Sequence, residues 1–378
     1  MERSAQLAMP VTWRYLEDDG ASHSAGLATD EFLMSRPVPT LRLYTYRSHS
    51  ALVGKFQNVE AEIDLRFCVE NGIAVNRRPT GGGAILMGEG QLGIAVVHSS
   101  RLPGVPEHPK EIFARFGRSL CAGLARCGIE GSLEAKNDIR VNGRKIAGLG
   151  VCRNEDGVFL FHTSLIVDLD VDLMLRVLRI PAEKLSDKLR ARVNENLTTV
   201  RRETGRAVSI DEAREALRGG FEETEGARFT SCPLDSTELE GVRRLESEKY
   251  LRESWVFQRV PTPDMNGTSL RKTPAGLLRL YLSLAGDRIK DVTITGDFIS
   301  DASAVLSLEK ELSSSPADAV SLRRLLAAHA ARNGGLAGGI AADDLAAAIL
   351  EAVGEARRVS GQGGPYGCFV DVQEGGAR

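Results

Sequence analysis

The chain has 378 residues, of which 42% are hydrophobic and 26% charged, and its formal net charge is −3. That length is enough for two domains with separate hydrophobic cores. Proteins that bind nucleic acid through their overall charge have a strong excess of basic residues, which this chain lacks. We therefore expect no nucleic-acid partner.

The sequence gives no indication of export or of a membrane anchor. The six cysteines are scattered without a CxxC pair, which argues against a zinc ribbon or a thioredoxin-like site and favours reduced thiols. The first residues lack a charged head followed by an apolar core, and no uninterrupted run of roughly 18 apolar residues occurs. We therefore expect a cytoplasmic monomer that does not bind a membrane.

The first two-thirds of the chain predicts strands and helices that alternate irregularly. Apolar residues recur at helical spacing over 111–127, where Cys121 and Cys127 are expected to fill the core. Alternating or continuous apolar residues predict strands at 41–46, 73–76, 92–97 and 158–167. A mixed sheet flanked by helices, of the α+β class, is the expected architecture.

A change in composition between 219 and 240 predicts a domain boundary, because the segment is polar and rich in glycine. We expect a catalytic domain over 1–232, a linker over 233–240 and a second, smaller α+β domain over 241–360. In that domain, alternating leucines from 278 to 284 and a turn at 285–287 predict a hairpin. Helices are expected around 306–312, 322–331 and 343–356. The glycine-rich residues 361–378, with Cys368, predict a flexible tail.

The first segment with chemical potential is RRPTGGGAIL, residues 77–86. Glycine allows the backbone to approach a ligand closely, and successive N–H groups can then surround a phosphate or a carboxylate. Arginine adds a planar, permanently charged group that suits phosphate oxygens. Three glycines alone are more often a simple loop, but the paired arginines favour an anion site. Its residues are Arg77, Arg78, Gly81, Gly82, Gly83, Ala84, Ile85 and Leu86.

The second segment is NDIRVNGRKIAG, residues 137–148. Apolar alternation around Asn142-Gly143 predicts a hairpin with a tight turn. Lys145 follows that turn and lies opposite Asn137 and Asp138, so its ammonium group could meet a phosphate. On this segment alone, a solvated strand lysine is the commoner explanation.

Two other features are weaker. The segment GEGQLG at 88–93 satisfies GxGxxG, but a strand-like run follows it where a dinucleotide site needs a helix, so we reject that reading. His162 lies within a predicted strand, where a single histidine is more often structural than catalytic.

Together, the two segments resemble the lipoate–protein ligase A family. The hallmarks of that family are a double arginine before three glycines and a later Gly-x-Lys-(Ile/Val)-x-Gly, preceded by Asn-Asp. Further similarity lies in Gly54-Lys55-Phe56-Gln57-Asn58, in 190–197, and in His162-Thr163-Ser164-Leu165, where the family pattern is His-Gly-Thr-Leu. Glu253-Ser254-Trp255 and Gly296-Asp297-Phe298 are similar to the small accessory domain of these ligases.

The resemblance implies a fold shared with biotin ligases, with a mixed β-sheet flanked by helices and a small α+β C-terminal domain. It also implies an activity in two steps. Lipoate or octanoate is activated by ATP with Mg²⁺ to an acyl-adenylate, and the acyl group then passes to a lysine of an acceptor protein. The implied acceptor is a lipoyl domain or a similar H-protein-like partner.

The resemblance also implies roles for individual residues. Lys145 would be catalytic, bridging the α-phosphate and the acyl oxygen. Arg77, Gly81 and Gly82 would support the loop, and Asp138 would be a weak candidate for a Mg²⁺ ligand. The residues expected to bind ATP and the acyl-adenylate are Arg78, Gly83, Ala84, Ile85, Leu86, Asn137, Asp138 and Lys145.

One departure from the pattern leaves alternatives open. After Gly-Gly-Gly-Ala the family has an aromatic residue and then His-Asp, whereas this chain has Leu86, Met87 and Gly88. The first alternative is an octanoyl- or lipoyltransferase of the same fold. The octanoyltransferase branch of the family has a catalytic Cys-Phe before the lysine segment, whereas this chain has Glu134-Ala135-Lys136 at that position. The second is a non-catalytic acyl-binding relative, against which the retained Lys145 argues. The missing Gly-Arg-Gly-x-x-Gly-Arg adenylate loop argues against a biotin ligase.

Overall fold

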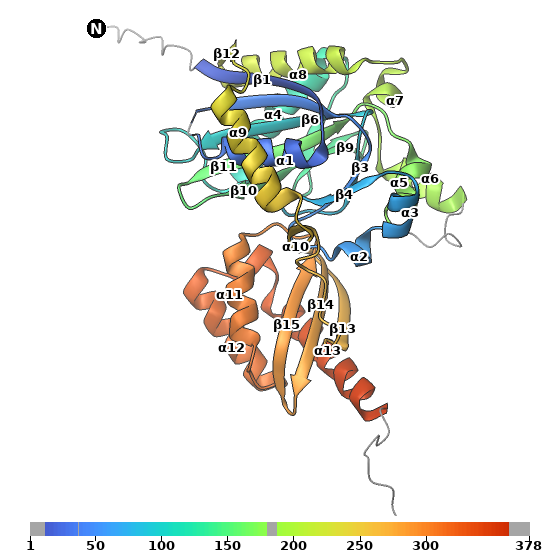
Figure 1. Ribbon diagram of the computed structural model, residues 1–378, viewed down its shortest axis with the longest axis vertical. Helices are drawn as coiled ribbons and strands as arrows, with labels where there is room; N and C mark the ends of the chain where they lie inside the picture. Colours follow the sequence, from blue (N-terminus) through green and yellow to red (C-terminus); the bar gives the residue numbers. More distant parts are fainter. Residues whose placement is uncertain (1–11, 37, 180–186, 363–378) are drawn as a thin grey trace, which may run out of the picture. The chain divides into compact units, whose positions relative to one another are not determined.

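The computed structural model of the protein describes residues 12–36, 38–179 and 187–362 (Figure 1). The chain divides into two compact units. Unit 1 holds the residues up to Val260 together with Asp297–Asp301, and unit 2 holds Pro261–Gly296 and the residues from Ala302 onward. The tail predicted over 361–378, with Cys368, lies outside the described residues except for 361 and 362, which end the last helix.

The division between the units falls later than the linker expected at 233–240. Helix α9 (Ser236–Leu245) begins within that stretch, and Asp235 caps its start. The Asp235 carboxylate accepts a hydrogen bond from the backbone N–H of Glu238, and the Glu238 carboxylate accepts one from the N–H of Asp235. Such a reciprocal cap fixes the start of a helix. Helix α9 packs against α1 (His23–Leu33), where Gly241 meets the ring of Phe32. The segment therefore belongs to the core of unit 1.

The main sheet of unit 1 is mixed. Its strand order is β12-β1-β2-β6-β11-β9-β8-β7, and β10 pairs with β11. Strand β1 runs parallel to both β12 and β2, whereas β6 runs antiparallel to its two neighbours, β2 and β11. The expected mixed α+β architecture is confirmed. The strands are β1 (Thr12–Ala21), β2 (Thr40–Tyr46), β6 (Gln91–Ser99), β7 (Ser132–Glu134), β8 (Asp138–Val141), β9 (Arg144–Gly148), β10 (Gly150–Arg153), β11 (Val158–Ile166) and β12 (Arg228–Ser231).

Helices cover both faces of this sheet (Figure 1). Helices α4 (Pro109–Arg126) and α8 (Ile210–Glu225) pack on one face around an aromatic core that includes Trp13, Phe116, Phe161 and Phe221. Cys121 and Cys127 pack against this core, as their helical spacing predicts. Helices α1 and α9 cover the other face. Because both faces are buried, the central strand β6 is buried along its whole length, which fixes its position in the fold.

A second, smaller sheet lies in unit 1, with the order β4-β3-β5 among the described strands. Its strands are β3 (Ser50–Val53), β4 (Ala74–Arg77) and β5 (Ile85–Met87), so the glycine loop joins β4 to β5. The remaining short helices of this unit include α5, which packs near β5 and α3. They are α2 (Val59–Glu62), α3 (Leu65–Glu70), α5 (Val171–Val177), α6 (Asp187–Asn196), α7 (Val200–Thr204), the π-helical turn Glu246–Tyr250 and α10 (Glu253–Val256).

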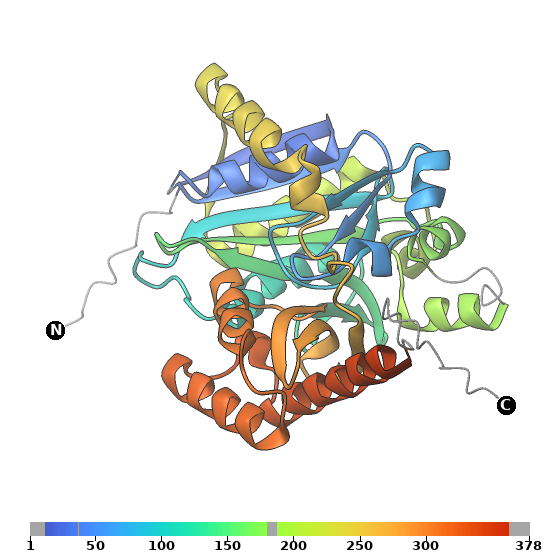
Figure 2. The ribbon, with the colours of Figure 1, turned by 60° about the horizontal axis from the view of Figure 1, so that its bottom comes forward.

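Unit 2 is a three-stranded antiparallel sheet with helices. The hairpin predicted from the alternating leucines is formed by β14 (Gly276–Ala285) and β15 (Arg288–Gly296), and β13 (Gly267–Thr273) pairs with β14. Figure 2 shows the long helix α13 (Ala342–Gln362) running along these strands. The other helical segments are α11 (Ala302–Leu312), α12 (Ala319–Asn333) and a 3₁₀ turn, Ala337–Gly339. Across the described parts of both units, no helix has the length and apolar character needed to cross a bilayer.

Candidate active site

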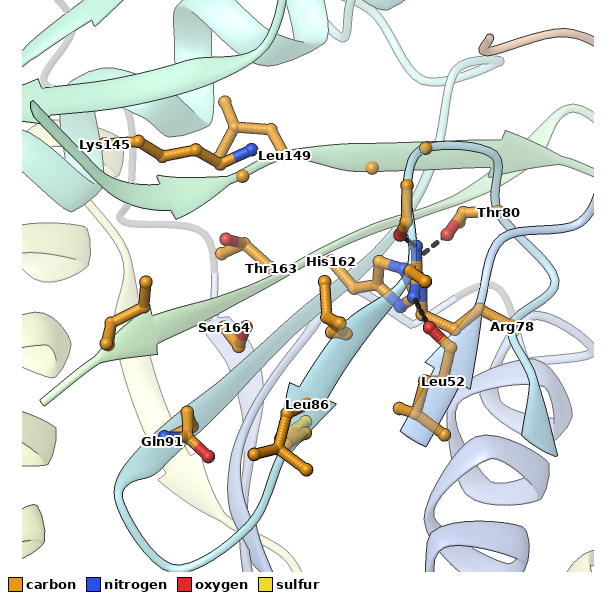
Figure 3. A pocket seen from close by; sticks show the side chains of 18 of the residues that line it. Leu52, Arg78, Thr80, Leu86, Gln91, Lys145, Leu149, His162, Thr163 and Ser164 are labelled. Carbon is orange, nitrogen blue, oxygen red and sulfur yellow. Dashed lines mark hydrogen bonds between the residues drawn. The ribbon is translucent and has the colours of Figure 1, made fainter. Parts of the chain in front are cut away.

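A cavity of about 280 Å³ lies in unit 1 and is lined by residues of both sheets. In Figure 3, Lys145 and Leu149 lie on one side of it, Leu86 and Gln91 on the other, and residues of β11 between them. Every residue expected to bind the nucleotide and acyl group lines this cavity except Asp138, which contacts Lys145. Segments far apart in the sequence are therefore brought together. Its apolar wall is made by Leu27, Tyr44, Tyr46, Leu52, Leu86, Met87, Ile166, Leu169, Met174 and Leu178.

The glycine loop offers backbone, not side chains, to this cavity. Gly82 has a φ of +95°, a conformation that favours glycine. A Cβ on Gly81 would lie 2.3 Å from the carbonyl oxygen of Phe298, whose ring stacks on Phe56. A Cβ on Gly54 would lie 2.0 Å from the carbonyl oxygen of Gly82. Close packing of backbone on backbone therefore requires glycine here, and a loop of this kind can surround an anion.

Arg78 holds this loop in place. Its guanidinium donates to the carbonyl oxygens of Leu52 at 2.6 Å and Gly83 at 2.7 Å, and the residue is buried while still lining the cavity. Burial lowers the pKa of Arg78 to about 10, so the side chain remains charged at neutral pH. Arg78 thus brings a positive charge to the cavity wall and fixes the shape of the glycine loop at the same time.

Arg77 points away from the cavity, although the sequence pairs it with Arg78. Its guanidinium donates to five backbone carbonyls, in the segments 54–57 and 255–256. Trp255 returns a hydrogen bond from its indole N–H to the carbonyl oxygen of Arg77 at 2.9 Å. Arg77 therefore contacts the backbone behind the glycine loop, and its role in supporting that loop stays a prediction.

Lys145 lies on the predicted hairpin of β8 and β9. Asn142 and Gly143 at its turn both have positive φ, as the Asn-Gly pair predicts. The Lys145 ammonium lies 2.8 Å from one carboxylate oxygen of Asp138, and Arg140 lies 3.2 Å from the other. Both oxygens of Asp138 are thus engaged by cations. A metal ion at Asp138 would have to replace one of them, so a metal role for this residue stays a prediction.

Two contacts fix this hairpin relative to the rest of the site. The Asn137 side chain donates to the carbonyl oxygen of Leu149 at 2.7 Å, and the N–H of Leu149 donates back to the carbonyl oxygen of Asn137 at 2.7 Å. The N–H of Thr198 donates to the carbonyl oxygen of Lys145 at 2.9 Å. Asn137 therefore positions the strand that carries Lys145, in addition to lining the cavity.

Gly148 leaves the space that the Lys145 side chain occupies. A Cβ at Gly148 would lie 2.6 Å from the Lys145 Nζ and 2.7 Å from its Cε. We expect Gly148→Ala to displace the ammonium without unfolding the protein, because the end of a lysine side chain can move. Because Lys145 is the predicted catalytic group, turnover should fall about 10-fold or more when its ammonium is displaced. The melting temperature should stay within a few degrees of the wild-type value. Steady-state kinetics and thermal unfolding check this; unchanged turnover would contradict it.

Two polar residues of the cavity belong to a buried polar network: Thr80, which the sequence analysis did not single out, and His162, which it took as structural. The hydroxyl of Thr80 lies 2.5 Å from His162 Nε2, and His162 Nδ1 lies 3.9 Å from a carboxylate oxygen of Asp30. Asp30 in turn forms a fully buried ion pair with Arg42 at 2.5 Å. Burial lowers the pKa of His162 against the opposing effect of the Asp30 carboxylate, so a neutral imidazole is favoured. Thr80 lies within the glycine segment 77–86, and this position is the sequence feature that could have marked it as a cavity residue.

The departure at Met87-Gly88 has a structural explanation. A Cβ at Gly88 would lie 2.1 Å from His49 Nδ1, so the imidazole of His49 fills the space that an aspartate side chain would need. Met87 is buried and lines the cavity, where it adds apolar surface. The glycine at position 88 is therefore accompanied by His49, whose ring occupies the adjacent space but does not line the cavity.

No described cysteine lines the cavity. Cys152 lies on β10 but packs into the core under α1, and burial raises its pKa to about 12. A thiol of that kind is not a reactive nucleophile at neutral pH. Among the described residues there is also no cluster of His, Cys, Asp and Glu side chains that could hold a metal ion.

The mixed sheet, the glycine loop and the lysine hairpin together define a lipoate ligase-like fold. The chain belongs to the lipoyl protein ligase A/B catalytic domain family, whose model matches residues 24–222, all within unit 1. The octanoyltransferase LipM of Carboxydothermus hydrogenoformans is 30% identical over 268 residues, which cover 65% of this chain and 99% of that protein.

Solved structures agree with this assignment. A bi-partite lipoate protein ligase from Thermoplasma acidophilum is 30% identical with a TM-score of 0.60, and the match covers 67% of this chain and 98% of that one. A lipoate-protein ligase A bound with ATP is also 30% identical, with a TM-score of 0.56 and coverage of 65% and 98%.

Proposed function

We propose that the protein is an ATP-dependent lipoate–protein ligase, which converts lipoate or octanoate to acyl-AMP and transfers the acyl group to a lysine of a lipoyl-domain or H-protein-like acceptor. The observation that carries the proposal is a single cavity with an apolar wall, in which Lys145 and the glycine loop meet and no described thiol is present.

In the first step, a carboxylate oxygen of the acid forms a bond to the α-phosphorus of ATP, and the bond to the β-phosphate breaks to release pyrophosphate. Two anions must approach each other, so positive charge has to be placed between them. The ammonium of Lys145 is suited to this because it can leave Asp138 and contact both the α-phosphate and the acyl oxygen. Mg²⁺, bound mainly by the phosphates themselves, would neutralise the departing pyrophosphate.

The acyl chain would lie against the apolar wall of the cavity. Burial of each methylene contributes roughly 0.8 kcal/mol, so a medium-length chain can be held by hydrophobic contact alone. Tyr44, Tyr46 and Met87 are buried in the core beside the cavity and give its wall apolar surface. This arrangement suits octanoate or lipoate and leaves the carboxyl group facing Lys145.

In the second step, the amine of the acceptor lysine attacks the acyl carbonyl. A carbon–nitrogen bond forms, the bond to the phosphate oxygen breaks, AMP departs with the electron pair, and a proton from the amine passes to solvent. Negative charge develops on the acyl oxygen during this attack, and Lys145 can stabilise it. One lysine thus serves both steps.

The second candidate is an octanoyltransferase of the same fold, and the similarity to the octanoyltransferase LipM favours it. A transferase that passes the acyl group through a covalent intermediate needs a nucleophile beside the acyl carbon. In the octanoyltransferase branch, that nucleophile is expected to be a cysteine ahead of the lysine segment. The corresponding residues here are Glu134 and Ala135, which is why we prefer the ligase.

Intact-mass spectrometry of an acceptor lipoyl domain distinguishes the candidates. The full-length protein is mixed with the acceptor and octanoate or lipoate, with and without Mg²⁺-ATP, and in parallel with an octanoylated carrier protein. Acylation that requires ATP and releases AMP is the expected result. Acylation from the carrier protein alone would establish the transferase instead, and no mass gain in either mixture would favour a non-catalytic acyl-binding protein.

A further inference from the structure

Thr163 carries a buried hydroxyl that the chemistry above does not use. The residue lies on β11, next to His162, and lines the cavity. It is 6% exposed, and its Oγ1 has no hydrogen-bond partner in the described structure. The neighbouring His162 ring, by contrast, is bonded to Thr80. In the His-Gly-Thr-Leu pattern that this segment resembles, the position of Thr163 is glycine, so the hydroxyl is a feature of this chain.

An unpaired hydroxyl at this depth needs an explanation. The large majority of buried polar groups in proteins have a partner, and leaving one unsatisfied costs about 1–3 kcal/mol. Figure 3 shows the oxygen of Thr163 directed toward β9, which carries Lys145. The group therefore lies at the polar side of the cavity, where a bound molecule can supply the missing partner.

The surrounding groups define which atom would bind there. Lys145 provides positive charge nearby, Asn137 lines the same side, and the imidazole of His162 is favoured in its neutral form. The opposite side is apolar apart from Gln91, whose side chain is already bonded to the backbone of Gly88 and Asp168. An oxygen that accepts a hydrogen bond, at the charged end of an otherwise apolar molecule, fits this combination, and a carboxylate oxygen is the acceptor that a lysine and a hydroxyl share most favourably.

We propose that Thr163 determines substrate binding by donating a hydrogen bond from Oγ1 to the carboxyl end of the acyl substrate, beside the Lys145 ammonium. The inference rests on the proposed function only in taking a free carboxylic acid as the substrate. Thr163 is a specificity residue: it holds the carboxylate by a hydrogen bond, and it forms no covalent bond and transfers no proton in either step. It would orient the carboxylate for its reaction, and it would weaken the binding of a chain that lacks an acceptor oxygen.

Thr163→Val tests this because valine has nearly the same shape without the hydroxyl. Two opposite changes are expected. The free protein should melt a few degrees higher, because an unpaired buried hydroxyl has been removed. The Kd for octanoate should rise about 10-fold or more, since the hydrogen bond to the charged group is lost. Thr163→Ser keeps a hydroxyl and should bind octanoate close to the wild-type level.

Titration calorimetry of the full-length protein with octanoate, without ATP or acceptor, measures this binding directly. This measurement does not depend on the ligase activity, because it detects binding of octanoate alone. The two candidate functions are tested separately, by acylation of the acceptor. Equal octanoate affinity in the wild type and Thr163→Val would overturn the proposal. So would the absence of octanoate binding to the wild type, or a lower melting temperature of Thr163→Val, which would mean that the hydroxyl has an internal partner.

Discussion

Lys145→Ala is expected to lower the rate of acyl-adenylate formation about 10³-fold. Removing one group that stabilises charge in a transition state lowers the rate by a factor on the order of 10²–10³, and the Lys145 ammonium is proposed to act on two oxygens. The fold should tolerate the change. The side chain of Lys145 is 34% exposed, and Asp138 keeps its contact with Arg140. The loss should therefore fall on chemistry and not on stability.

Exchange of labelled pyrophosphate into ATP, in the presence of octanoate, measures the first step alone. Acylation of the acceptor from pre-formed octanoyl-AMP measures the second step. Both should fall in Lys145→Ala, because one ammonium is proposed to serve both. Lys145→Arg is the matched control: it keeps the positive charge and should retain more activity than alanine. Wild-type exchange in Lys145→Ala would remove this residue from the proposed mechanism.

Local patterns were enough to predict much of the site. Successive glycines, the Asn-Gly turn and the alternating residues around it are short-range signals, and each corresponds to the element it predicts. The glycine loop and Lys145 were expected to act together only through the resemblance to a family, because nothing local links residues 77–86 to 137–148. The fold supplies that link by placing both segments at one cavity.

Long-range pairs account for what the sequence could not reveal. His49 and Gly88 depend on each other, as do Thr80 and His162, yet neither pair has a spacing that identifies it. The start of α9 was different, since Asp235 and Glu238 have the spacing of a reciprocal helix cap and could have been recognised. The polar composition around them concealed a helix that packs on α1.

Arg77 shows why residue type alone did not settle a role. Two adjacent arginines before glycines suggest a shared anion site, but Arg77 ends β4 and Arg78 follows it, and successive side chains along extended backbone point to opposite sides. Arg78 faces the cavity wall, whereas Arg77 is fully buried among backbone carbonyls. Burial lowers the pKa of Arg77 to about 9, so it is still protonated at neutral pH. Its charge is stabilised by the carbonyl oxygens of Gly54, Lys55, Gln57, Trp255 and Val256.

Arg77→Ala is accordingly expected to reduce the free energy of unfolding of unit 1 by about 4 kcal/mol, because it leaves several buried carbonyls without a donor. Single hydrogen bonds to charged groups contribute about 1.5–3 kcal/mol, and the contributions of bonds made by one side chain do not add in full. Arg77→Lys should recover little of this. An ammonium cannot reach carbonyls on both the 54–57 and 255–256 segments, whereas the planar guanidinium does.

Denaturation followed by tryptophan fluorescence reports on unit 1, since Trp13 and Trp255, the only tryptophans of the chain, both lie in it. Arg66→Ala is the control. Arg66 pairs with Glu70 on the solvent-exposed face of α3, so its removal should leave the unfolding midpoint unchanged. An Arg77→Ala protein that unfolds at the wild-type midpoint would mean that the carbonyls find other donors. In that case the glycine loop would not depend on Arg77 for its position, and Arg78 alone would hold it.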